Sequence, residues 1–220
     1  MKTLFVNNLI EASSICIDLI FKEQNKSSNK LNIALTGGRF GKYFAGELAN
    51  SEIFLNKIRF FQTDERLVSF SDQECIQKML LNKLGQFTNL ETCFFDLNTS
   101  AISSGANMKK NIDELNLKKL DIAIMSLGED GHLAGNFPES KNIGNEITYI
   151  NDSPKPPLKR ISFSVEWLAQ SDLVLIVALG SDKNEAVRDL ISKKSPFSSY
   201  IESSRNVFFI TDQITSIDKN

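Results

Sequence analysis

Residues 120–125 read LDIAIM, and residues 126–132, which follow directly, read SLGEDGH. The first stretch is a short apolar run, typical of a strand that is buried on both faces. The second is a loop rich in glycines and charges, placed at the carboxyl end of that strand. Because open α/β sheets bind their ligands outside the carboxyl ends of the strands, we expect a parallel sheet with a site in this loop.

Strand and helix patterns alternate along the chain on both sides of this stretch. Short apolar runs predict the strands, and apolar residues three and four positions apart predict the helices between them. Without an internal repeat or a Ser/Gly linker, this alternation predicts a single doubly wound α/β domain over residues 1–220, with a mostly parallel sheet flanked by helices. The expected strands are 31–36, 57–62, 92–95, 120–125, 146–150, 160–165, 173–179 and 206–210, and the expected helices are 9–24, 41–50, 73–84, 99–115 and 182–193.

The composition excludes several classes of protein. The 220 residues carry 25 Lys+Arg against 27 Asp+Glu, a net charge of −2, which gives no basic field for nucleic acid or for an anionic membrane. The longest apolar run, 173–179, is too short to span a membrane. The single histidine cannot build a zinc site that needs two or three imidazoles. Three cysteines without a C-x-x-C pair, and no visible secretion signal, predict a reducing, cytoplasmic location.

Two further segments after predicted strands could carry a site. Residues 36–42 read TGGRFGK, a glycine-rich turn whose backbone N–H groups, with the following helix N-terminus, could bind an anion. The alternative is a plain turn that needs positive φ, since neither a P-loop nor a G-x-G-x-x-G motif is present. Residues 63–66 read TDER: Asp64 could orient a sugar hydroxyl or a water, and Arg66 could bind a phosphate, or the segment could be a surface ion cluster.

His132 is the side chain best suited to take a proton from water at neutral pH, because imidazole titrates near ~6.5. Asp130, two residues earlier, could fix its tautomer. A lone histidine is often structural, but a loop with two glycines and two acids is atypical of a core. Lys183 follows the strand 173–179 and could meet the same anion as Gly37 and Gly38, or serve as an ordinary lysine at a helix start. The residues alone therefore predict an α/β enzyme for a small phosphorylated or anionic molecule.

Taken in order, five motifs resemble those of the 6-phosphogluconolactonases, in the wider family that also holds the glucosamine-6-phosphate isomerases/deaminases. The deaminases carry a glutamate just before the proline that follows the Asp-Gly-His loop, where this chain has Phe137, and tend to read Asp-Glu-Tyr where this chain has Arg66 as the third residue. The lactonase interpretation is therefore favoured. The five motifs are Thr36-Gly37-Gly38, Asp64-Glu65-Arg66, 127–132 with Phe137-Pro138, 154–157 through Arg160-Ile161, and Gly180-x-x-Lys183.

The resemblance implies a Rossmann-like fold of the sugar-phosphate isomerase/lactonase type. It also implies hydrolysis of 6-phospho-D-glucono-1,5-lactone to 6-phosphogluconate in the oxidative pentose phosphate pathway, with no cofactor and no metal. His132 would be the general base on water, and Asp130 would orient it. The partner would be a phosphorylated sugar lactone, and the protein could be a monomer or a homodimer. The residues expected to hold the phosphate and the sugar are Gly37, Gly38, Arg39, Asp64, Arg66 and Lys183.

The chain departs from the family pattern beside two of these motifs. It has Arg39-Phe40-Gly41 where the family commonly has Ser-Thr-Pro, and residues 133–136 read LAGN where the family commonly has Thr-Ala-Ser-Leu. Arg39 could replace the missing hydroxyls with a direct charge. Two alternatives stay open: a sugar-phosphate isomerase or deaminase, which shares the Asp-Gly-His loop, and a non-catalytic sugar-phosphate binding protein, suggested by the altered flanks.

Overall fold

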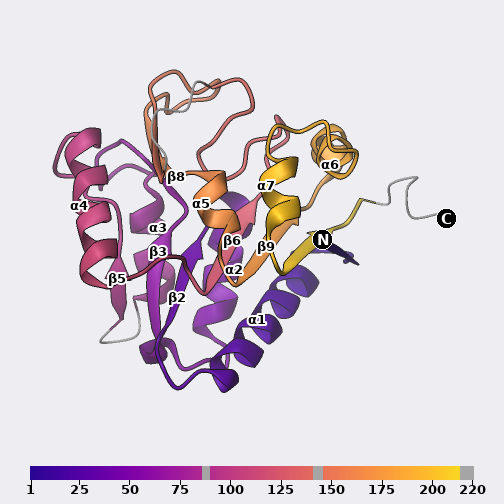
Figure 1. Ribbon diagram of the computed structural model, residues 1–220, viewed down its shortest axis with the longest axis horizontal. Helices are drawn as coiled ribbons and strands as arrows, with labels where there is room; N and C mark the ends of the chain where they lie inside the picture. Colours follow the sequence, from indigo (N-terminus) through magenta and orange to yellow (C-terminus); the bar gives the residue numbers. More distant parts are fainter. Residues whose placement is uncertain (86–89, 141–145, 214–220) are drawn as a thin grey trace.

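The structure, a computed structural model, describes residues 1–85, 90–140 and 146–213. Within these ranges, seven strands form a central sheet in the order β1-β10-β9-β6-β2-β3-β5, and every neighbouring pair is parallel (Figure 1). The parallel α/β sheet that the alternation predicts is therefore confirmed. Its strands are β1 (Lys2–Phe5), β2 (Leu31–Leu35), β3 (Ile58–Gln62), β5 (Glu91–Cys93), β6 (Ile122–Ser126), β9 (Leu173–Ala178) and β10 (Val207–Thr211).

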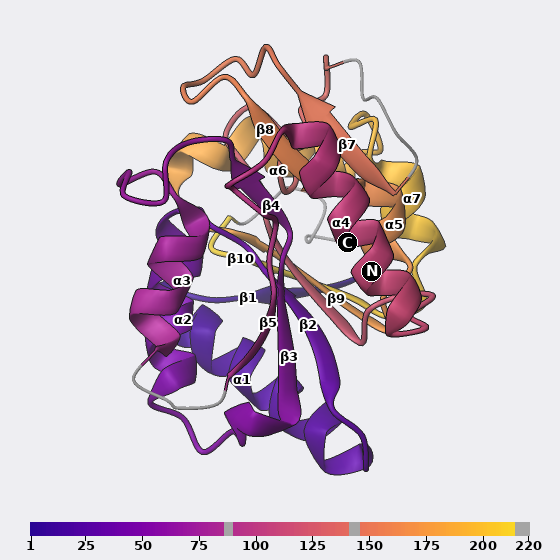
Figure 2. The ribbon, with the colours of Figure 1, turned by 90° about the vertical axis from the view of Figure 1, so that its left-hand side faces the viewer.

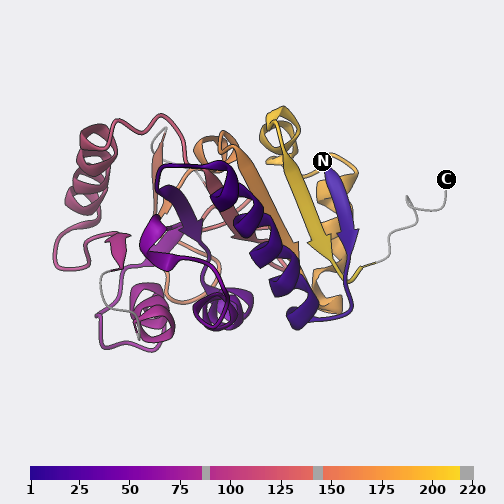
Figure 3. The same cartoon turned by 90° about the horizontal axis from the view of Figure 1, so that it is seen from below.

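Helices cover both faces of this sheet. One face carries α1, α2 and α3, and the other carries α4, α5 and α7 (Figure 2). Seen from below, α1 lies across the strands near the edge that holds the N-terminus (Figure 3). The helices are α1 (Leu9–Lys26), α2 (Gly38–Ala49), α3 (Ile76–Leu84), α4 (Ala101–Glu114), α5 (Val165–Ala169), α6 (Asn184–Ile191) and α7 (Ser198–Ser203), with short 3-10 helices at Leu55–Lys57 and Ser181–Lys183.

Successive side chains along each central strand pack into two different hydrophobic cores. In β2, Ile33 and Leu35 pack with α1, α2 and α3, whereas Ala34 packs with the helices of the opposite face. In β9, Leu175 likewise belongs to the core under α1, α2 and α3, and Ile176 belongs to the core on the opposite face. Because both faces of the strands are covered, these strands read as continuous apolar runs rather than as alternating patterns.

A second, smaller sheet was not predicted. It has the order β4-β8-β7, with β4 (Asp64–Arg66), β7 (Ile147–Ile150) and β8 (Arg160–Phe163) all antiparallel. The strand predicted at 160–165 does form, but it pairs with β4 and β7 rather than with the central sheet. In this small sheet Asp64 lies opposite Ser162 and Arg66 opposite Arg160, whereas the strands of a buried parallel sheet are near-continuous apolar runs.

Several element boundaries also differ from the prediction. The strand β1 and the helices α5 and α7 were not predicted, because four to six residues are too few to show a period. Helix α2 begins at Gly38 rather than near residue 41, so the glycine turn is itself the first helical turn. The helix predicted over 182–193 is divided between a 3-10 turn and α6. A single domain over 1–220 stays a prediction, and no helix in the described ranges is both long and apolar enough to cross a membrane.

Candidate active site

The loop after β6 brings His132 and Asp130 together. The imidazole Nδ1 hydrogen-bonds to Asp130 Oδ1, and the backbone N–H of His132 donates to the same oxygen at 3.3 Å. Two backbone hydrogen bonds close the turn, from Gly128 N–H to His132 O at 2.9 Å and from Gly131 N–H to Gly128 O at 3.1 Å. A Cβ on Gly128 would lie 2.0 Å from His132 Nδ1, so only glycine leaves room for the imidazole. With Nδ1 engaged by Asp130, Nε2 is the nitrogen left to take a proton.

Asp130 is a charged carboxylate with one oxygen still available. Burial disfavours its ionisation, but the hydrogen bond and charge of His132, with the charge of Lys155, outweigh burial and lower the pKa of Asp130 from 3.8 to about 2. Its Oδ2 has no hydrogen-bond partner in the described part of the chain and lies 3.9 Å from Lys155 Nζ. At neutral pH Asp130 can therefore orient His132 and stabilise its protonated form.

Phe137 supports the imidazole from the side. Its buried ring lies with its centroid 4.9 Å from that of His132, and the two planes are tilted by 39°. The guanidinium carbon of Arg160 lies 5.2 Å from the same ring centroid. The residue by which the sequence differs from the deaminases is thus in direct contact with the histidine.

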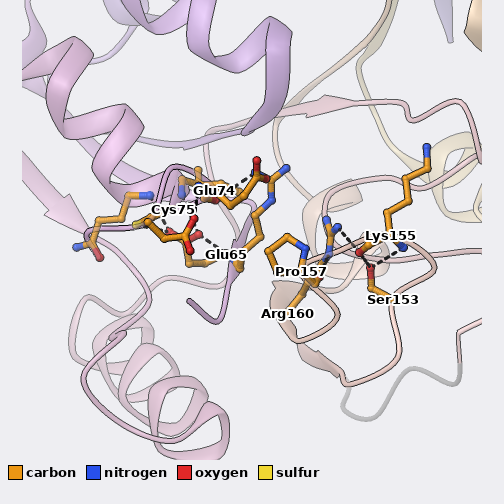
Figure 4. Close-up of polar contacts among 11 residues, drawn as sticks. Glu65, Glu74, Cys75, Ser153, Lys155, Pro157 and Arg160 are labelled. Carbon is orange, nitrogen blue, oxygen red and sulfur yellow. Dashed lines mark hydrogen bonds and ion pairs between the residues drawn. The ribbon is translucent and has the colours of Figure 1, made fainter. Parts of the chain in front are cut away.

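Lys155 reaches the site from the loop between β7 and β8, and Arg160 is the first residue of β8. Both lie in one of the five sequence motifs, but they were not predicted as site residues. Lys155 Nζ forms an ion pair with Glu129, the residue before Asp130. Arg160 donates from Nε to the carbonyl of Pro157 at 3.2 Å and from Nη2 to the carbonyl of Lys155 at 3.1 Å (Figure 4). The proline-rich segment 154–157 could have indicated Lys155 and Arg160, because such a segment is typical of a loop with a restricted backbone.

Arg39 and Lys183 line one pocket of about 290 Å³ at the carboxyl ends of β6 and β9. Lys183 Nζ lies 3.4 Å from Ser126 Oγ, and Arg39 Nη2 donates to the carbonyl of Leu179 at 3.2 Å. Burial lowers the pKa of Lys183, the charge of Asp182 opposes that shift, and the charge of Arg39 adds to it. The pocket is also lined by the carboxylate of Asp182 and by apolar residues such as Phe40. Two cations against one carboxylate leave an excess of positive charge, which favours an anionic ligand there.

Gly37 and Gly38 open helix α2 beside this pocket. No side chain caps the helix at Gly37, so its first backbone N–H groups remain available to an anion. Gly38 has a φ of +69°, which is in the left-handed region that favours glycine. On its other side Gly38 lines a smaller pocket, of about 150 Å³, together with Arg66 and Lys42. The structure thus places Arg39 with Lys183, and Arg66 with Gly38, on two sides of one helix start.

The motif 63–66 contains residues with different surroundings. Glu65 is fully buried and accepts hydrogen bonds from the backbone N–H groups of Ile76 and Gln77, at 2.9 and 2.6 Å, so it caps helix α3. Asp64 is buried, accepts the hydroxyl of Thr63 at 2.8 Å, and its charge acts on Arg160. Arg66 donates from Nη1 to the Glu74 carboxylate at 2.7 Å.

Electrostatic interactions connect these groups into one edge of the molecule. The charge of Glu129 acts on Lys183, and the charge of Asp182 acts on Lys155. The charges of Asp64, Arg66 and Asp130 in turn act on Arg160. The charged side chains among the predicted site residues are therefore close enough to act on one another or on Arg160. In the part of the chain that the structure describes, no group of three or more His, Cys, Asp or Glu side chains is placed to hold a metal ion.

Comparison with known proteins agrees with this arrangement. The family model for glucosamine-6-phosphate isomerases/6-phosphogluconolactonase matches residues 8–209. The chain belongs to this family. Among its curated relatives is 6-phosphogluconolactonase 4 of Saccharomyces cerevisiae, 29% identical over 186 residues, covering 74% of this chain and 73% of the relative. Another is the 6-phosphogluconolactonase of Borreliella burgdorferi, 30% identical over 180 residues and covering 74% of each chain.

Solved structures share the fold of this family member. The crystal structure of 6-phosphogluconolactonase from Thermotoga maritima superposes with a TM-score of 0.82 at 21% identity, covering 96% of this chain and 99% of that one. A monomeric glucosamine-6-phosphate deaminase reaches the same TM-score at 17% identity, covering 97% of this chain and 98% of that one. Because both activities use one fold, the residues of the site have to distinguish them.

Proposed function

We propose that this chain hydrolyses 6-phospho-D-glucono-1,5-lactone to 6-phosphogluconate, as a 6-phosphogluconolactonase of the oxidative pentose phosphate pathway. The observation that carries the proposal is the His132–Asp130 pair in the loop after β6, beside a pocket lined by two cations. The family match and the names of the curated relatives support the same substrate class.

The geometry of the pair supports the following mechanism. Nδ1–H of His132 donates to Asp130, and Nε2 accepts a proton from water. The resulting hydroxide adds to the lactone carbonyl, and the ring oxygen leaves with a proton returned by the imidazolium. A positioned acid–base group of this kind contributes typically about 10²–10⁴-fold in rate. Asp130 stabilises the imidazolium while it holds the proton, because the carboxylate is ionised at neutral pH.

The charged groups on either side of the pair would hold the two ends of the substrate. Arg39, Lys183 and the start of α2 would bind the phosphate, because they combine two cations with free backbone N–H groups. Asp64 and Arg66 lie in β4, which pairs with the strand of Arg160. Asp64 would orient a sugar hydroxyl, and Arg66 would stabilise the developing oxyanion. Arg39 thereby supplies a charge where the family commonly has hydroxyls.

Phe137 argues against the deaminase alternative. A deaminase needs further acid–base groups for ring opening and proton transfer, whereas the buried ring of Phe137 occupies the place beside His132.

A cytoplasmic location is part of the same proposal. It is supported by the free, buried thiols of Cys16, Cys75 and Cys93.

The test adds the wild-type protein to freshly generated lactone and measures the rate of proton release above that of spontaneous hydrolysis. We expect saturable hydrolysis, with no ammonia from glucosamine 6-phosphate under the same conditions. Ammonia release without lactone hydrolysis would replace the proposal with a deaminase. Calorimetric binding of 6-phosphogluconate without turnover of either substrate would replace it with a binding protein.

A further inference from the structure

Arg160 is a buried cation that forms no hydrogen bond or ion pair with His132 or Asp130. It contacts Phe137, which lies against His132, and the backbone of Lys155, whose side chain approaches Asp130. It is 5% exposed, at the first residue of β8. One contact is the ring of Phe137, with the guanidinium carbon 5.2 Å from the ring centroid. The other is the loop before β8, through the carbonyls of Lys155 and Pro157 at 3.1 and 3.2 Å.

The first contact leads to the imidazole. The ring centroid of Phe137 lies 5.2 Å from the guanidinium carbon of Arg160 and 4.9 Å from the centroid of the His132 imidazole. A guanidinium within about 6 Å of an aromatic ring centroid is attracted to the ring. The position of Phe137, and with it one side of the surroundings of the His132 imidazole, therefore depends on Arg160.

The second contact leads to the carboxylate. Ser153 closes the loop by donating from Oγ to the carbonyl of Lys155 at 2.6 Å, and Arg160 donates to that same carbonyl (Figure 4). With its backbone fixed from both sides, Lys155 extends to the ion pair with Glu129 and to within 3.9 Å of Asp130 Oδ2. Lys155 is about half exposed, so a free lysine there would sample many rotamers.

We propose that Arg160 is the positioning residue of the site, which sets the orientation of His132 through Phe137 and the placement of Lys155 against Asp130 through the loop 153–158. A planar guanidinium can donate to two carbonyls and lie against a ring at once, whereas an ammonium is a compact point charge without this fork. Lysine therefore cannot replace arginine here. The kinetic part of this inference rests on the proposed function, but its spectroscopic part does not.

The experiment compares Arg160→Lys with wild type, using protein labelled with ¹⁵N-histidine. Since the sequence holds one histidine, the imidazole signals in each spectrum belong to His132 alone. We expect Arg160→Lys to lose the ring-current shift that Phe137 imposes on the imidazole protons, and to weaken the downfield Nδ1–H signal of the bond to Asp130. We expect kcat to fall roughly tenfold to a hundredfold, as for a displaced catalytic group, with KM near the wild-type value.

Arg59→Lys is the matched control. Arg59 in β3 also uses a fork, pairing with Glu91 and donating to Asn32 Oδ1 at 2.9 Å, but it does so near the amino end of its strand. This variant should lower stability without moving the His132 signals. If both variants leave those signals and kcat at wild-type values, or if both change them alike, Arg160 is not the positioning residue.

Other outcomes still decide the matter. If Arg160→Lys does not fold, Phe137→Leu and Lys155→Met remove the two contacts separately, and a wild-type kcat with an unweakened Nδ1–H signal in both would overturn the inference. If the wild type does not hydrolyse the lactone, the proposed function fails, but the imidazole signals still show whether Arg160 positions His132.

Discussion

Glu65 and Asp130 are two carboxylates at the same edge of the molecule, and they differ in how many of their oxygen lone pairs are used. Both oxygens of Glu65 are saturated, by Gln62 Nε2 at 2.7 Å and by backbone N–H groups of three residues at 2.6–2.9 Å. Asp130 bonds to His132 through one oxygen and leaves the other without a hydrogen-bond partner within the described ranges. A saturated carboxylate stabilises the fold, whereas a partly used one can respond to a substrate.

The largest expected effect is that of Asp130→Asn on activity. An amide cannot stabilise the imidazolium as a carboxylate does, and its NH₂ group can force the wrong imidazole tautomer. We expect kcat to fall about 10²–10⁴-fold. The melting temperature should stay within a few degrees of wild type, since this side chain is partly exposed. A large loss of stability with normal kcat would place Asp130 with Glu65 as a structural group.

Gly128→Ala changes the geometry of the same loop without removing a functional group. The new Cβ would meet His132 Nδ1 at 2.0 Å and Asp130 Oδ1 at 2.6 Å, so the pair has to separate. We expect at least a tenfold loss of kcat, on the order of what misplacement by 1 Å costs. Gly46→Ala in α2 is the matched control, because among the described residues its Cβ would meet only Lys83, at 3.8 Å. Equal kcat in the two variants would contradict the close packing of the loop.

Glu65→Ala should show the opposite behaviour to Asp130→Asn. Its removal leaves buried N–H donors at the start of α3 without an acceptor, which costs about 1–3 kcal/mol. For a chain of this size that corresponds to a fall in melting temperature of roughly 2–12 °C. The kcat of the folded fraction should fall far less than in Asp130→Asn. Thermal unfolding and activity measured on the same preparations compare the two carboxylates directly.

The smallest effect is an opposite pH dependence of stability. The pKa of Asp130 is lowered from 3.8 to about 2, so its contribution is present above its ordinary pKa and is lost as pH falls toward 2. Burial raises the pKa of Glu65 above 4.5, although its hydrogen bonds act in the opposite direction. Its contribution to the free energy of unfolding is therefore present below pH 4.5 and is lost as the pH rises through the raised pKa. From pH 3 to pH 7, the loss of melting temperature relative to wild type should therefore grow for Asp130→Asn and shrink for Glu65→Gln. Parallel changes would contradict these shifts.

The sequence predicts the central sheet well and the site in part. The apolar runs in β6 and β9 identify the parallel sheet, and the glycines and acids around His132 identify the loop beside it. The separation of Asp64 from Glu65 could not be predicted, because neighbouring residues in a short strand face opposite ways and only the packing of α3 shows which is saturated. Arg160 was missed as a site residue because it acts indirectly, through the ring of Phe137 and through the backbone carbonyl of Lys155.

The rate of lactone hydrolysis by His132→Ala tests the central claim most directly. With one histidine in the chain, no other imidazole can take over the proton transfer. The measurement is kcat on fresh lactone, corrected for the spontaneous reaction, for folded wild type and variant. We predict that the variant loses nearly all of the wild-type rate enhancement, about 10²–10⁴-fold, while still binding 6-phosphogluconate. A variant that retains the wild-type kcat would contradict the account.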